Sequence, residues 1–337
     1  MIFRTPQYYD KFRCSADKCS DNCCIGWEID IDDSTLNTYI NTKGEFGDRL
    51  KQSISNGCFV LTHNDRCPFL NKRNLCDIYI ELGEKSLCQI CTDHPRFYEW
   101  FGNIKEGGTG LCCEESAKLI LANDFVLTET EIPDEECDIP DEVLFSTLLN
   151  ARQLIIFHLQ NDSSLAETVE HLLSFTEELQ FRIDNYDFTI PEWNNNINPK
   201  RTDIKDILEF LLTLEPIDDK WIPFIKKSIE YSDLFTGIGK EYESYMRRIA
   251  VYFVYRYFLK GVYDGEIISK IKLAVLSTWI IGFLWCFRND NSLENMSVTA
   301  KNYSKEIEYS TDNLETLFDV FYKEEFFSSE CLSGLFM

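Results

Sequence analysis

The sequence predicts a mainly α protein, in which a cysteine-rich metal-binding N-terminal domain of short irregular elements packs on an all-α C-terminal helical domain. The chain has 337 residues, enough for two domains that each bury a core. Eleven of the 14 cysteines fall in the first 113 residues, and apolar residues at helical spacing dominate after residue 114. We therefore expect the two domains to span residues 1–125 and 126–337.

The N-terminal part is a series of short pieces broken by Cys, Gly, Asn and Asp. GWEIDIDD (26–33) alternates like a short strand or extended segment, whereas DDSTLNTYINT (32–42) starts with N-cap residues and continues with helical spacing. Such pieces bury little apolar surface alone. An internal cross-link or a metal would replace the missing core.

The C-terminal part is expected to be an all-α domain of helices joined by loops. EESAKLILA (114–122) has acids in its first turn and predicts a helix directly after Cys113. An acidic stretch with prolines, 129–141, is the expected domain boundary or loop, and 191–199 is a polar linker. Helical spacing recurs at 142–160, 164–183, 204–214, 222–231, 240–262, 267–287 and 313–327.

No segment is expected to cross a membrane. The longest run without a charge, Leu273–Phe287, has 15 residues and is better interpreted as a buried helix. The polar start of the chain lacks the apolar region of a secretory signal, so we expect a cytoplasmic protein with reduced thiols.

The charge is distributed unevenly. Residues 1–113 carry 13 basic and 16 acidic residues, which leaves 20 of the 33 basic and 41 of the 57 acidic residues, a net of −21, for residues 114–337. This sign repels phosphate backbones and anionic lipids, which argues against a nucleic-acid or membrane partner. The acidity either serves solubility or attracts a cationic protein partner.

The cysteines follow a pattern typical of metal ligation. The spacings are Cys14-x4-Cys19-x3-Cys23-Cys24, Cys67-x8-Cys76, Cys88-x2-Cys91 and Cys112-Cys113. Zinc sites commonly use paired CxxC motifs, and here Cys88 and Cys91 form the one such pair in the sequence. The irregular spacing favours an iron–sulfur cluster over zinc. Side chains of adjacent cysteines diverge, so one member of each adjacent pair is expected to be packed rather than bound to the same ion.

Three runs resemble the flagellin lysine N-methylase family, which shares its cysteine pattern with a broader group described as zinc- or iron-chelating proteins. They are KCSDNCCIGW (18–27), CPFLNKRNLCDIYIELGEKSLCQICTDHPRF (67–97) and GLCCEESAKLIL (110–121). The resemblance covers residues 1–124. Beyond them it rests on length and helical character.

The resemblance implies methyl transfer from S-adenosylmethionine to lysine ε-amines of flagellin, by an enzyme with a [4Fe–4S] cluster. Cys58, Cys88 and Cys112 match the family pattern less securely than the other cysteines. Radical S-adenosylmethionine enzymes usually show CxxxCxxC, whereas the nearest string here is Cys19-x3-Cys23-Cys24, which argues against a radical mechanism. The cysteines that match as metal ligands are Cys14, Cys19, Cys23, Cys24, Cys67, Cys76, Cys91 and Cys113.

Candidate cofactor-binding residues lie beside these cysteines. Arg96 could hold the carboxylate of the methionine moiety, and His94 could bind metal or carry a proton. Gly107 and Gly108 are also candidates, although GGTG (107–110) follows no convincing strand and favours a turn that leads Cys112 into a helix.

The catalytic base is unknown from sequence. A lysine must lose its proton before it attacks a methyl group, so a carboxylate or tyrosine is expected nearby. His63, His158 and His171 are expected to be packing or surface histidines. The alternative function is a non-catalytic zinc- or iron-binding or electron-transfer module that docks on a basic protein partner. The candidates for the base near the motifs are Tyr98, Glu99, Glu106, Glu114 and Glu115.

Overall fold

The computed structural model describes residues 1–133, 135, 137–194 and 196–337. In it, the start of the chain pairs with later segments in a four-stranded sheet. The strand order is β4-β5-β1-β6, with β1 parallel to β5 and antiparallel to β6. β4 and β5 form an antiparallel hairpin around Gly102, whose φ of +58° suits a glycine. The strands are β1 (Ile2–Pro6), β4 (Arg96–Phe101), β5 (Ile104–Thr109) and β6 (Leu127–Glu131).

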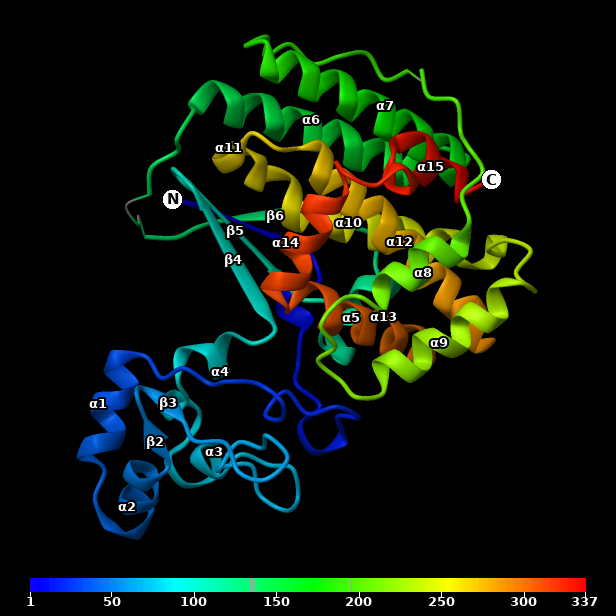
Figure 1. Ribbon diagram of the computed structural model, residues 1–337. Helices are drawn as coiled ribbons and strands as arrows, with labels where there is room; N and C mark the ends of the chain where they lie inside the picture. The colour runs from blue at the N-terminus through cyan, green and yellow to red at the C-terminus, as the bar shows by residue number, and fades with distance from the viewer. Residues whose placement is uncertain (134, 136, 195) are drawn as a thin grey trace.

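Between β1 and β4 the chain leaves the sheet and forms a small unit, at the lower left of Figure 1. Asp32 caps its first helix by accepting from the Thr35 amide, and it also accepts from the Gln89 amide. Tyr39, Leu50 and Phe69 are fully buried in a separate small core. The elements are α1 (Asp33–Asn41), α2 (Gly44–Gln52), β2 (Ile54–Ser55), β3 (Cys58–Phe59), α3 (Asp77–Leu82) and α4 (Gln89–Asp93).

The remaining helices form the larger body in the upper part of Figure 1. Its centre is α12, and the most apolar 18-residue window of this helix is 89% buried. Among the described residues α12 alone is long and apolar enough to cross a membrane by length and composition, and as predicted its apolar stretch lies inside the protein. The helices are α5 (Glu114–Ala122), α6 (Glu142–Asn161), α7 (Leu165–Asp184), α8 (Ile204–Leu211), α9 (Trp221–Ser232), α10 (Glu243–Tyr257), α11 (Gly261–Asp264), α12 (Ile268–Arg288), α13 (Leu293–Glu308), α14 (Thr311–Val320) and α15 (Ser329–Gly334).

The two hydrophobic cores divide the chain in space. The small core takes its members from residues 24–91, whereas the large core includes Tyr8, Phe101, Leu111 and α5 together with the C-terminal helices. The division into domains at residue 125 stays a prediction. The mainly α class is confirmed, with the strands confined to the sheet and one short hairpin among the described residues.

The predicted turn at 107–110 is wrong, because residues 107–109 belong to β5. Glycines weaken an isolated strand, but here aromatic rings cover them. A Cβ on Gly107 would lie 2.8 Å from the Phe3 ring, and one on Gly108 would lie 2.4 Å from the Phe97 ring. The glycines therefore allow two large rings to lie directly on the strand.

Candidate metal centre and active-site cleft

A cleft of about 810 Å³ lies where the small unit meets the larger body. The arm that follows β1, residues 12–24, forms one wall, and the second half of α4 and the start of α5 contribute to the others. Seven of the eight predicted metal ligands line this cleft, and Cys112 lines it as well. The cysteines in its walls are Cys14, Cys19, Cys23, Cys24, Cys76, Cys91, Cys112 and Cys113.

Cys19, Cys23 and Cys113 form the outer group. Burial raises the pKa of Cys19, and Cys23 is close enough to raise it further. Burial also raises the pKa of Cys113 to about 12, while the amides of Ser116 and Glu115 lower it and the neighbouring Cys23 and Cys19 raise it. Three thiols from distant parts of the chain thus lie close enough to affect one another's ionisation and face open space.

Cys67, Cys76, Cys88 and Cys91 form the inner group, which lies in or against the small core. The sulfur atoms of Cys88 and Cys91 are 3.3 Å apart, and this contact lowers the pKa of Cys88 and raises that of Cys91. Burial raises the pKa of Cys67 to about 11, and the nearby thiols of Cys76 and Cys88 raise it further. Cys67 and Cys88 are buried, so they do not reach the cleft.

The two groups meet at the adjacent pair Cys23 and Cys24. A hydrogen bond with Cys24, followed by desolvation, raises the pKa of Cys23, and a hydrogen bond with His94 lowers it. Cys24 is close enough to Cys91 to raise the pKa of that thiol. The adjacent thiols of Cys23 and Cys24 therefore contact each other, whereas the sequence argument expected their side chains to diverge.

Cationic and aromatic side chains complete the cleft. Arg96 lies over the rings of Tyr9 and Phe12, with its guanidinium carbon 5.5 and 5.1 Å from their centroids. Lys305 of α13 has its Nζ 5.7 Å from the Trp27 ring, which also lines the cleft. The cleft thus offers two fixed positive charges to an anionic group beside a set of thiols.

Asp21 joins the arm to the helical body at the edge of the cleft. Its carboxylate accepts hydrogen bonds from Lys301 at 3.0 Å and from Lys305 at 3.3 Å. Burial alone raises the pKa of Asp21, but the two lysines outweigh it and hold the pKa below its ordinary value. The arm is therefore fixed to α13 by an ion-pair network.

Behind the cleft, buried polar groups of the helical body hold Cys112. Arg256 donates to the Tyr252 hydroxyl at 2.6 Å and pairs with Glu308 at 3.2 Å. The Tyr252 hydroxyl also accepts from the Leu111 amide at 3.0 Å, and Tyr309 hydrogen-bonds the Cys112 thiol. The loop that presents Cys112 is thus tied to α10 and to the end of α13.

The structure separates the predicted candidates for the base. Glu114 lines the cleft, where partial burial raises its pKa but hydrogen bonds from Ser20 and Lys118 lower it to about 2. The other candidates have partners elsewhere: Tyr98 bonds Tyr9, Glu99 pairs with Lys260, Glu106 with Arg152, and Glu115 with Lys118. Sequence reasoning did not single out Trp27, although it ends the motif KCSDNCCIGW, or Lys305, which lies outside the three motifs.

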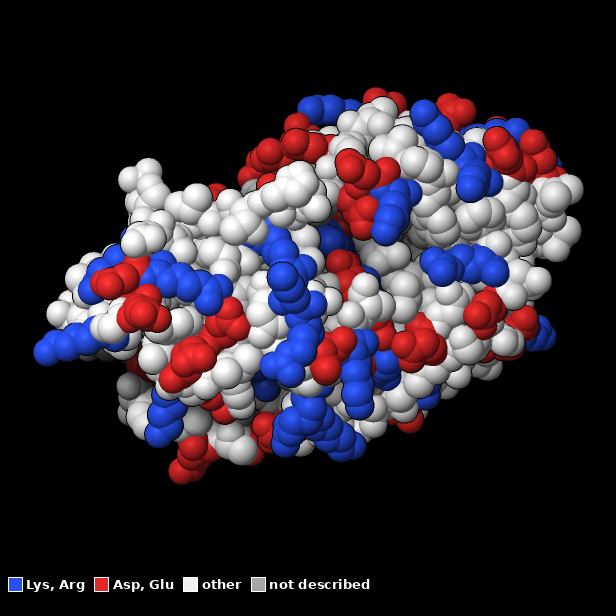
Figure 2. All heavy atoms as spheres, turned by 90° about the horizontal axis from the view of Figure 1, so that it is seen from below, with Lys and Arg blue, Asp and Glu red and all other residues white. Residues whose placement is uncertain are grey.

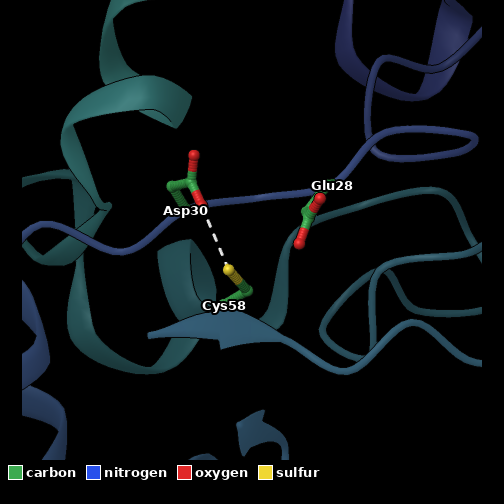
Figure 3. Close-up of side chains that lie close together, drawn as sticks. All are labelled: Glu28, Asp30 and Cys58. Carbon is green, nitrogen blue, oxygen red and sulfur yellow. Dashed lines mark hydrogen bonds between the residues drawn. The ribbon is translucent and has the colours of Figure 1, made fainter. Parts of the chain in front are cut away.

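Gly107 and Gly108 lie in β5 under the Phe3 and Phe97 rings and do not line the cleft. Their role in cofactor binding stays a prediction. Cys58 also lies apart from the cleft, with its sulfur 3.0 Å from Asp30 and with Glu28 nearby (Figure 3). Hydrogen bonds with Asp30 raise the pKa of Cys58 to about 11, so this thiol keeps its proton and donates it.

The acidic excess does not form a uniform surface. On the face shown in Figure 2, Lys and Arg side chains form a band across the middle, between acidic side chains on both sides. In the acidic stretch 129–141, Glu129 pairs with Arg4 and Glu135 pairs with Lys105. Residues 134 and 136 of that stretch lie outside the described residues.

Comparisons with known proteins show a similarity in the C-terminal part of the helical body. Residues 202–335 match the family model described as the FliB lysine N-methylase C-terminal domain. The flagellar biosynthetic protein FliU of Salmonella muenchen and the lysine-N-methylases of Salmonella typhimurium strain LT2 and Salmonella choleraesuis are each 28% identical to this chain over 130 residues. These matches cover 34% of this chain, 75% of FliU and 31% of each lysine-N-methylase, so the matched part is about a third of those two relatives.

The resemblance to the lysine N-methylase family is confirmed. No solved structure matches the chain. The family match lies in the C-terminal helices, not in the cysteine motifs that suggested the resemblance. Within the matched residues, Lys305 lines the cleft and Arg256 and Tyr309 hold the loop of Cys112 from behind. The helices within the matched residues thus reach the cleft, and through Tyr309 they contact Cys112 directly.

Proposed function

We propose that this protein is a lysine N-methylase that transfers methyl groups from S-adenosylmethionine to lysine ε-amines of flagellin. The names of the matched relatives support lysine methylation, and FliU is a flagellar protein by name. The proposal rests on the composition of the cleft. Eight cysteines line it together with Lys305 of α13, which lies within the family-matched residues. We also propose that the protein acts in the cytoplasm, without a nucleic-acid or membrane partner.

The proposal includes a [4Fe–4S] cluster in the cleft. Iron–sulfur clusters are held by thiolates, and the donors that face the open space here are predominantly thiols, which fits this group. Cys19, Cys23 and Cys113 would hold the cluster, with Cys14 of the same wall as the fourth thiolate. When bound, the cluster would supply one-electron chemistry.

The chain's own residues must bind both substrates and accept one proton. In the transfer, the lysine nitrogen attacks the methyl carbon, a C–N bond forms, the carbon–sulfonium bond breaks, and S-adenosylhomocysteine leaves. Arg96 and Lys305 are placed to bind the carboxylate of the methionine moiety. The ionised Glu114 would attract the lysine ammonium, and His94, the histidine among the cleft-lining residues, would take up its proton.

The decisive experiment is transfer of labelled methyl from S-adenosylmethionine to flagellin by anaerobically purified protein. Label should appear on lysine ε-amines by mass spectrometry, and iron and acid-labile sulfide should be present at about four each per chain. Cys286→Ser is a matched control because Cys286 lies on α12, away from the cleft-lining residues. Bound metal without any methyl transfer would favour the electron-transfer module instead.

A further inference from the structure

Arg13 of the arm lines the cleft, and the proposed function gives it no role. Its Nη1 donates to two main-chain carbonyls, that of Asp10 at 2.8 Å and that of Phe12 at 2.6 Å. The described residues supply no acceptor for Nε or Nη2 and no carboxylate partner. A guanidinium binds a carboxylate through two parallel hydrogen bonds along one edge. The Nε–Nη2 edge of Arg13 is therefore open to a carboxylate of a bound molecule.

The local backbone holds this guanidinium in place. A short turn, Tyr9–Lys11, precedes Arg13, and the Phe12 amide donates to the Tyr9 carbonyl at 3.3 Å. The Phe12 side chain is 5% exposed and anchors the turn in the protein. The two carbonyls that accept from Nη1 are thus fixed before any ligand binds. A group that is already oriented loses less conformational freedom on binding, which favours affinity.

The carboxylates of the cleft do not neutralise Arg13. Asp21 is bound to two lysines of α13, and Glu114 pairs with a lysine of α5. Among the described residues Glu84, the third carboxylate of the lining, has no basic partner in a salt bridge. Arg96 is the other guanidinium of the lining, and the proposed function uses it for the methionine carboxylate. Arg13 is therefore the guanidinium left for the second substrate.

Unpaired positive charge is concentrated in the segment that carries the arm. In residues 1–113, four of 13 basic residues form a salt bridge, compared with 13 of 20 among the described part of residues 114–337. The band of Lys and Arg in Figure 2 lies on the lower side of Figure 1, where the arm and the small unit are drawn. An acidic ligand is therefore favoured on this side, although the whole chain has a net charge of −24.

We propose that Arg13 binds an acidic side chain of the protein substrate, so that the enzyme prefers lysines with Asp or Glu nearby in the sequence. The inference rests on the proposed function for its substrate class. In it, Glu114 faces the lysine ammonium and Arg13 faces the carboxylate of the same segment. A compact space of 810 Å³ is about 12 Å across, which an extended chain covers in about four residues. The acidic residue is therefore expected within about four residues of the lysine.

The test compares three synthetic peptides that share one central lysine and carry Glu, Gln or Arg at the flanking positions. Fluorescence anisotropy measures their affinity for anaerobically purified full-length protein, and the same peptides serve as methyl acceptors. The Glu peptide should bind about tenfold more tightly than the Gln peptide, the order expected for one charge-assisted contact. Arg13→Gln should abolish this preference, and Arg13→Glu should reverse it in favour of the Arg peptide.

Matched variants separate this contact from a general effect of charge. Lys227→Glu on α9 changes the net charge as Arg13→Glu does, at an exposed residue outside the cleft lining, and should keep the preference. Arg13→Lys keeps the charge without the fork and should keep part of it. Because Cys14 follows Arg13, iron and acid-labile sulfide are measured in every variant and should equal the wild-type values.

Equal affinity of the wild type for the Glu and Gln peptides, or no binding of any peptide, would overturn the inference. So would an equal loss of preference in Lys227→Glu, since it would mean that bulk charge decides. Weaker binding of S-adenosylmethionine instead of the peptide in Arg13→Gln would place Arg13 on the cofactor and also overturn it. Methyl transfer without a preference refutes this inference alone, whereas a preference in binding without methyl transfer refutes the proposed function alone.

Discussion

Replacing Arg152 by alanine should destabilise the protein by about 3–5 kcal/mol, because it leaves a buried carboxylate without its partner. Arg152 on α6 is 2% exposed and Glu106 on β5 is 3% exposed. The guanidinium makes two parallel bonds to the carboxylate, at 2.7 and 2.5 Å, and Arg152 also donates to the Tyr255 carbonyl at 3.3 Å. This pair connects the sheet to the helical body.

The size of the effect follows from burial. An exposed ion pair contributes at most about 1 kcal/mol, since water screens it and solvates either partner after the other is removed. Water does not reach Glu106 in this way, so its charge must be neutralised or hydrated at a cost of several kcal/mol. Lys323→Ala is the matched control, because Lys323 pairs with Asp319 on the surface, with exposed fractions of 65% and 72%.

Urea denaturation of both single variants measures the two free energies of unfolding. The double variant Arg152→Met with Glu106→Leu removes both charges and should recover most of the loss, because apolar side chains can replace a buried pair. If Arg152→Ala costs less than about 1 kcal/mol, or if the double variant is as unstable as the single one, the reasoning is wrong.

Three further predictions concern the arm, the substrate and the base. Asp21→Asn should lower stability at pH 7, because the α13 lysines depress the folded pKa of Asp21. This contribution exists above the unfolded pKa of about 3.9 and disappears as the pH falls through the folded pKa. In urea denaturation the difference from wild type should shrink as the pH falls below about 3.9, and a constant difference would contradict this. If the acidic excess attracts flagellin, the second-order rate constant of methylation should fall markedly as the salt concentration rises from about 20 to about 300 mM. The double variant Glu131→Lys with Asp138→Lys should lower the same rate constant. A rate constant unaffected by both changes would leave solubility as the role of the charge. His94→Gln should lower the methylation rate at least tenfold with unchanged iron content, and a simultaneous loss of iron would instead place His94 among the metal ligands.

The helices that the sequence predicts well have strong local signals. Asp141, Ser164 and Asp203 each cap a helix by accepting from amides of its first turn, and α6, α7 and α8 begin as expected. The expected helix 240–262 is interrupted after Tyr257 by a tighter turn, and the expected helix 313–327 begins at Thr311 and ends at Val320. Caps and apolar periodicity are local, so they can be read without the fold.

α13 was not predicted, because its stability depends on distant partners. Its sequence LENMSVTAKNYSKEIE buries polar side chains that an isolated amphipathic helix would expose. Lys301 pairs with Asp21 of the arm, and Glu306 accepts from the amides of Ile217 and Asp218. A pattern analysis cannot assign such residues to the core, since only the tertiary structure supplies their partners.

The cysteine motifs predicted a thiol-rich site, but not how the thiols divide. Cys23 and Cys24 are adjacent and contact each other, but the fold also brings Cys23 near Cys113 and Cys24 near Cys91. Cys88 matched the family pattern less securely, yet it is the most buried member of the inner group. Such divisions arise from which short segments pack against each other, and spacing does not encode that.

The position of the family match has a consequence for how activity could be lost. The matched helices contribute Lys305 to the cleft, and through Arg256 and Tyr309 they fix the loop that carries Cys112 and Cys113. Each of these links crosses from residues 202–335 to residues 1–113, so separating the two segments removes contacts from both sides of the cleft. The cysteine-rich segment would lose a positive charge and the support of its last two thiols, whereas all eight cysteines that line the cleft would stay with residues 1–113. The walls of the cleft are therefore complete only while the two segments stay packed together, which the contacts between α5 and α13 support.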